Sequence, residues 1–140
     1  MKKYTESTRY FEKALDDPVY SGKAGIYENM ARCAESQNNL KRAEEYYLQA
    51  LRLDPMLPNA NLGMARMTFD MSLYTQSRQY LERYLERRKH NAQSLWLGIL
   101  LERQAGNRNR VASYAMLLKG RYPNSEETRK LRKLESQGKL

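Results

Sequence analysis

Residues 24–55 read AGIYENMARCAESQNNLKRAEEYYLQALRLDP, and this stretch decides the fold. It places large residues such as Tyr27 and Tyr47 close in sequence to small ones such as Ala31. Small residues let two antiparallel helices approach closely, and the tyrosines fill the space beside them. Pro55 ends the second helix, because proline lacks a backbone N–H and restricts the residue before it. The stretch therefore predicts a pair of tightly packed helices.

The same spacing matches the 34-residue template of the tetratricopeptide repeat (TPR), which is W-x2-L-G-x2-Y, then A-x3-F, then P. So many positions matched in register are hard to obtain by chance. We therefore expect a helix at about 24–37, a turn at Asn38-Asn39 and a second helix at about 40–53. The matched positions are Tyr27, Met30, Ala31, Ala34, Ala43, Tyr47 and Pro55.

Further copies of the pattern follow along the chain. Pro123 lies two template periods after Pro55, and Gly106-Asn107 stands where a third interhelix turn is expected. The second copy departs from the template at Asn61, where the first copy has a tyrosine, and the third is looser because Trp96 and Gly98 each lie one place off. Three complete repeats are predicted, at about 24–57, 58–91 and 92–123.

The two ends of the chain carry partial units. Residues 3–18 are similar to the second helix of a repeat with its terminal proline, so we expect a leading half repeat there. A repeat helix without its partner leaves an apolar face uncovered, which suggests a larger parent protein with repeats before Met1. A helix at about 125–137, with N-cap residues and first-turn acids, is expected as a C-terminal capping helix. The sequence thus predicts one all-α domain over 1–140, a TPR superhelix.

The bulk composition limits the classes of function. The net charge of +9 favours an acidic partner, an anionic membrane surface or nucleic acid, but the lysines and arginines occur in almost every predicted helix. Single-strand binding requires aromatic residues on the same basic face, and most tyrosines fall on core positions, so nucleic acid is not favoured. No run approaches the roughly 18–20 apolar residues of a membrane span, and residues 1–15 contain no apolar signal-peptide region.

The residues that carry chemistry are few. The single histidine, His90, closes a basic cluster at a helix end and is expected to be a solvated cation there. The single cysteine, Cys33, is expected to be a small buried hydrophobic residue, and it leaves the redox compartment undetermined. The glycines are scattered rather than gathered in a phosphate-binding loop. We therefore predict no enzymatic activity, no cofactor and no metal site.

A TPR array offers a concave groove lined by the first helix of each repeat. Apolar residues beside arginines in this groove suit an amphipathic helix or an extended acidic peptide, and tryptophan and arginine are the types most often found as binding hot spots. Trp96 has the alternative role of core packing in the third repeat. The predicted groove residues are Glu28, Arg32, Asn59, Leu62, Arg66, Phe69, Trp96, Leu100 and Arg103.

The later part of the chain resembles the PilF/PilW family of type IV pilus biogenesis proteins, which are TPR lipoproteins of the Gram-negative outer membrane. The resemblance covers about 20–130 and is distinctive mainly in the third repeat. It is carried by LWLGI (95–99), GNR (106–108), SYA (113–115) and RYPNSEE (121–127), and LERYL (81–85) fits the same pattern.

This resemblance implies a pilotin, a periplasmic scaffold that helps the secretin ring to reach the outer membrane, assemble or remain stable. The implied partner is a protein, a secretin or another pilus-assembly component, with no small-molecule substrate. The implied location is the periplasmic face of the outer membrane, and membrane contact would be made only through a lipid anchor. Family members carry a signal peptide and a lipidated cysteine. Neither is in this sequence, and Cys33 lies mid-helix, which again suggests an N-terminally truncated chain.

Two other hypotheses remain open. One is a cytosolic TPR adaptor that binds a peptide tail, which would place the protein in the cytoplasm. The other is an RNA-associated helical-repeat protein, which the net charge of +9 motivates. RNA binding with a steep salt dependence would favour the second of these.

Overall fold

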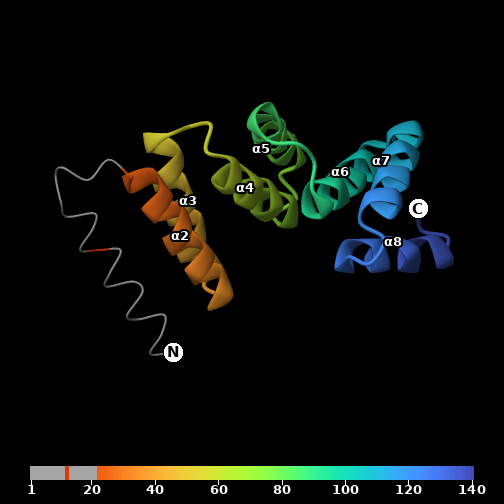
Figure 1. Cartoon of the computed structure of the whole chain (residues 1–140), viewed down its shortest axis with the longest axis horizontal. Coiled ribbons are helices and arrows are strands. Elements are labelled where there is room, and N and C mark those ends of the chain that lie inside the picture. The colour runs from red at the N-terminus through yellow and green to blue at the C-terminus, as the bar shows by residue number, and fades with distance from the viewer. Residues whose placement is uncertain (1–11, 13–21) are drawn as a thin grey trace.

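The computed structural model describes residue 12 and residues 22–140, and almost all of the predicted half repeat at 3–18 lies outside them. The part that is described contains helices and no strand, and it forms an all-α TPR superhelix (Figure 1). None of its helices is both long and apolar enough to span a membrane. The helices are α2 (Lys23–Ser36), α3 (Leu40–Leu53), α4 (Pro58–Asp70), α5 (Tyr74–Arg87), α6 (Ala92–Ala105), α7 (Arg108–Arg121) and α8 (Glu126–Ser136).

Successive helices pair as α2 with α3, α4 with α5 and α6 with α7, and the pairs follow one another along the long axis (Figure 1). Each pair is joined by a short turn with one residue at positive φ, namely Asn38 at 60°, Ser72 at 63° and Gly106 at 79°. These residues are one template period apart. Glycine adopts this conformation without a steric cost and asparagine tolerates it. The turn geometry is therefore repeated even at Ser72, where the residue type does not favour it.

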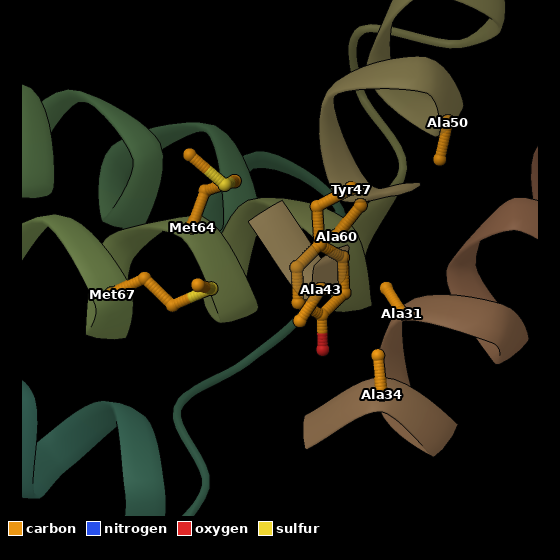
Figure 2. Packing of buried hydrophobic residues seen from close by; sticks show 8 residues of the cluster. All are labelled: Ala31, Ala34, Ala43, Tyr47, Ala50, Ala60, Met64 and Met67. Atoms are coloured by element: carbon orange, nitrogen blue, oxygen red, sulfur yellow. The ribbon is translucent and has the colours of Figure 1, made fainter. Parts of the chain in front are cut away.

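The first core cluster explains why α2 and α3 lie so close together. Ala31, Ala43 and Ala50 are fully buried, and Tyr47 of α3 lies in the same cluster as they do, together with Ala60 of α4 (Figure 2). A Cβ atom built at Gly63 in α4 would lie 2.5 Å from the Tyr47 ring. Gly63 is therefore the position that lets the tyrosine ring pack between the first two helix pairs.

The positions that depart from the template have specific structural roles. Asn61 is fully buried, and its amide Nδ2 donates hydrogen bonds of 3.0 Å to the backbone oxygens of Pro55 and Leu57. A polar side chain thus holds the link between two repeats where the first repeat has an aromatic ring. In the third repeat, Leu95 fills the aromatic position and is fully buried. Leu95 thus takes the position that Tyr27 holds in the first repeat, while Trp96 and Gly98 stay one place off the template.

Glu102 connects the second helix pair to the third. It is 2% exposed, and its carboxylate accepts hydrogen bonds from Arg78 of α5 and, at 2.6 Å, from Asn107 Nδ2. Arg110 lies 3.7 Å from the same carboxylate. Burial would raise the pKa of Glu102, but these hydrogen bonds and the charges of Arg78 and Arg110 outweigh it and bring the pKa below its ordinary value. A buried carboxylate is thus kept ionised between two repeats.

α8 begins one template period after α6 and packs against both α6 and α7. The Ser125 hydroxyl oxygen accepts a hydrogen bond from the Thr128 N–H and so caps the helix, as first-turn chemistry predicts. Thr128 and Leu131 are fully buried, and Thr128 Oγ1 donates to the backbone oxygen of Tyr122 at 2.6 Å. α8 therefore stands where the first helix of a further repeat would stand.

Two residue-level expectations need correction. His90 is half-buried rather than solvated: its ring lies edge-on to Tyr114, with centroids 5.3 Å apart, and Nδ1 lies 2.9 Å from Ser94 Oγ. Burial, and secondarily the charge of Arg121, lowers the pKa of His90, so the neutral ring is favoured. Cys33 is partly exposed rather than fully buried, because it lies beside the helix face that packs and not on it.

Candidate partner-binding groove

Two adjoining hollows run across the first helices of the repeats. Their volumes are about 620 Å³ and about 270 Å³, and they share Leu62, Arg66 and Gln93, so they form one continuous groove. The larger hollow is otherwise lined by Arg32, Glu35, Ser36, Tyr47, Asn59 and Asn91. The smaller is otherwise lined by Phe69, Asp70, Trp96, Leu97, Leu100, Glu127 and Lys130.

The larger hollow is polar, and an ion pair forms part of its lining. Arg66 Nη2 of α4 lies 2.7 Å and 2.5 Å from the two carboxylate oxygens of Glu35 in α2. Burial first and the Glu35 carboxylate second raise the pKa of the neighbouring Tyr47 hydroxyl, which keeps the hydroxyl protonated. Arg66 therefore fixes two repeats to each other, and its charge is already matched by Glu35.

Arg32 differs from Arg66. It is exposed, and among the described residues no carboxylate lies within ion-pair distance of its guanidinium. Its charge acts on Glu28, one turn earlier in α2, but without direct contact, so the guanidinium can still bind an acidic group of another molecule. Arg32 is thus the arginine of the polar half that is best placed for recognition.

Glu28 has a structural role that the sequence did not predict. Its carboxylate accepts hydrogen bonds from the Ala60 N–H at 3.0 Å and from Asn59 Nδ2 at 3.3 Å, at the first turn of α4. Leu57 occupies the N-cap position of α4 and has no side chain that could accept these bonds. Glu28 therefore caps α4 from the preceding repeat. Burial raises its pKa, and the two hydrogen bonds oppose that shift.

The smaller hollow is the apolar half of the groove. Phe69, Trp96 and Leu100 are partly buried and line it, whereas Leu62 is only 7% exposed and belongs mainly to the core beneath. Trp96 also packs against the third core cluster, as the alternative interpretation of this residue expected.

The structure brings most of the predicted residues together but not all of them. Arg32, Asn59, Leu62, Arg66, Phe69, Trp96 and Leu100 line the groove, and Glu28 lies at its edge through its bond to Asn59. Arg103 lies elsewhere: it lines a separate crevice beside α7, because the end of α6 faces residues 138–140 there and not the groove. The role of the groove residues in partner binding stays a prediction.

Sequence reasoning missed the contribution of α8. Glu127 and Lys130 line the apolar half, and they lie one template period after Gln93 and Trp96. The same period that located the turns could have found both residues, but the final helix was treated only as a cap.

Comparison with known proteins agrees with this architecture. The tetratricopeptide repeat family matches residues 24–56, and the helix pairs and their groove define a TPR protein. The chain is 32% identical over 126 residues to the type IV pilus assembly protein PilF of Pseudomonas aeruginosa, a match that covers 90% of this chain and 50% of that protein. The chain is a PilF/PilW-like TPR protein.

Solved structures give the same result. The structure of P. aeruginosa PilF superposes with a TM-score of 0.87 at 30% identity and covers 94% of this chain and 59% of that one. PilW, described as a widely conserved type IV pilus biogenesis factor, superposes with a TM-score of 0.71 at 28% identity and covers 93% and 60%. The chain thus spans about half the length of the curated relative and about 60% of these structures.

Proposed function

We propose that the chain is a non-enzymatic protein–protein scaffold in type IV pilus biogenesis, and that its groove holds a segment of a pilus-assembly protein. The observation that carries this proposal is the likeness to PilF along 90% of the chain. A TPR fold is typically used for binding proteins, and no cluster of residues able to hold a metal ion occurs among the described residues.

The chemistry of the groove indicates the kind of segment that it holds. One half offers the apolar side chains of Phe69, Trp96 and Leu100, and the other offers the exposed guanidinium of Arg32 and the amide side chains of Asn59 and Gln93. An amphipathic helix or an extended segment with an apolar residue near a carboxylate matches both halves. The proposed partner is a secretin or another component of the pilus machinery.

The role of a pilotin follows from the same proposal. The scaffold would act at the periplasmic face of the outer membrane and would help the secretin to reach that membrane, assemble or remain stable there. Fractionation of a Gram-negative envelope that expresses the full-length protein tests this location. Recovery in the cytoplasmic fraction would instead favour a cytosolic adaptor.

The proposal is tested by a pull-down from a detergent-solubilised Gram-negative envelope with three baits: the wild-type chain, Arg32→Glu and Arg132→Glu. Arg132 is exposed on α8 and lines neither hollow, so its variant makes the same charge change outside the groove. We expect the wild type and Arg132→Glu to recover a secretin or another pilus component, and Arg32→Glu to lose it. Equal recovery by all three would place the contact outside the groove.

A further inference from the structure

A separate crevice lies between α7 and the end of α8. Its volume is about 710 Å³, and it shares no lining residue with the groove. Val111, Ala112, Ala115 and Met116 of α7 form an apolar floor. Met116 is 75% exposed, which is a large exposure for an apolar side chain on a packed helix.

The repeat period shows why this crevice is open. A crevice of about 320 Å³ lies at the equivalent place one repeat earlier, between α5 and α6, and Arg78 lines it while its guanidinium binds Glu102. One template period after Arg78, Leu81 and Glu82 come Ala112, Ala115 and Met116. Ala112 and Ala115 thus stand where the preceding repeat has two large side chains, and Met116 stands where it has a carboxylate. The last crevice is therefore larger than its counterpart, about 710 Å³ against about 320 Å³.

The rim of the crevice is strongly basic. It carries Arg103, Arg108, Lys119 and Lys139 against one acidic side chain, Glu135, which is already paired with Lys119 at 2.9 Å. For the other three cations, the part of the chain that the structure describes provides no carboxylate within ion-pair distance. An apolar floor inside a ring of unpaired cations is complementary to an apolar side chain flanked by carboxylates.

We propose that this crevice is a second docking site, and that it binds a short acidic amphipathic segment of another protein. An apolar side chain of the segment covers Met116 and fills the space above Ala112 and Ala115, while its carboxylates pair with Arg108, Arg103 and Lys139. A concave space of this size suits inserted side chains rather than a flat lipid surface. A second copy of this chain is disfavoured because each copy carries a net charge of +9. The site is independent of the groove, so the two partners could be bound together.

The double variant Ala112→Arg/Met116→Glu provides a matched test. It copies Arg78 and Glu82 from the equivalent places on α5, so the substitutions are ones that this fold already accommodates, and the net charge is unchanged. A displayed library of random peptides is selected on the immobilised wild-type chain and counter-selected on the double variant. We expect enriched peptides in which acidic residues flank apolar ones, and affinities at least about tenfold weaker for the double variant. Arg32→Ala, an exposed residue of the groove, should change these affinities by less than about twofold.

Arg108→Glu provides a second variant whose folding is not in question, because an acidic residue is favourable in the first turn of a helix. We expect it to weaken the selected peptides at least about fivefold, while Arg132→Glu changes their affinity by less than about twofold. The proposal is overturned if no peptide is enriched, if the enriched peptides are neutral or basic, or if they bind the variants as tightly as the wild type. Binding of phosphatidylglycerol vesicles or dimerisation of the chain that the double variant abolishes would also overturn it.

Discussion

The turns within the helix pairs repeat one backbone geometry, but the junctions between successive pairs are held together by different side chains. Between the first and second pairs, the Tyr47 ring lies against Gly63, and Arg66 pairs with Glu35. Between the second and third pairs, the buried Glu102 accepts hydrogen bonds from Arg78 and Asn107. The first junction thus relies on close packing and the second on a buried charge. The template thus sets the spacing of the repeats but does not determine which side chains hold each junction.

The largest loss of folding stability is expected from a substitution beside the buried carboxylate of Glu102. Arg78→Ala should destabilise the chain by about 3 kcal/mol, because it leaves Glu102 buried without its main partner. Chemical denaturation measures this loss. The double variant Arg78→Ala/Glu102→Leu should recover part of the stability, since no charge is then left unpaired. A loss no larger than that of an exposed ion pair, which is below about 1 kcal/mol, would show that Glu102 is not the element that holds this junction.

The close-packed junction is tested at its glycine. Gly63→Ala should destabilise by about 1–3 kcal/mol, because the new methyl group would lie 2.5 Å from the Tyr47 ring. Gly25→Ala is the matched control: its Cβ would meet no atom of the described residues within 4 Å, so helix propensity should make it neutral or stabilising by up to about 1 kcal/mol. Thermal unfolding of both variants measures the difference. If the two substitutions behave alike, the tyrosine does not pack as tightly as described.

A smaller change in folding stability is expected when the pH falls through the range in which His90 titrates. Its folded pKa lies below the ordinary value of 6.5, so the unfolded chain binds the proton more readily. The contribution of His90 to stability is therefore complete above pH 6.5 and is lost as the pH falls below it. The depressed pKa of Glu102 acts in the same direction but only below its ordinary value of 4.5. The pH ranges in which His90 and Glu102 change the stability are thus separate.

The measurement is the melting temperature between about pH 7 and about pH 5. The change from about pH 7 to about pH 5 should be more destabilising for the wild type than for His90→Asn, which cannot titrate in this range. Glu28, whose raised pKa acts in the opposite direction, is present in both proteins. Parallel curves for the two proteins would mean that burial of His90 does not depress its pKa.

Much of this fold could be predicted from the sequence because the TPR template is defined by the spacing of residue types along the chain. The expected helix at 24–37 is α2 at Lys23–Ser36, and the expected helix at 40–53 is α3 at Leu40–Leu53. Local signals such as Ser125 before first-turn acids located α8 equally well. These elements depend on periodicity and capping, which a sequence displays directly.

The candidate site was less predictable because it depends on which side chains satisfy one another. Arg66 was expected to face a partner, but Glu35 neutralises it, so Arg66→Glu would also break a contact between repeats. Glu28 was expected in the groove, but its carboxylate accepts a hydrogen bond from the first turn of α4, which has no cap of its own. A template assigns a position to a face of the helix, and it carries no information about the partner across the junction.

The central claim, that the groove holds a pilus-assembly protein, is tested most directly by site-specific photo-crosslinking in a Gram-negative envelope. A photoreactive phenylalanine analogue is placed at Phe69 in the apolar half of the groove and, in a second chain, at Leu48, an exposed residue of α3 that lines neither hollow. We expect the chain labelled at Phe69 to form an adduct with a secretin or another pilus component, and the chain labelled at Leu48 to form none. An adduct with a pilus component at Leu48 alone would contradict the claim.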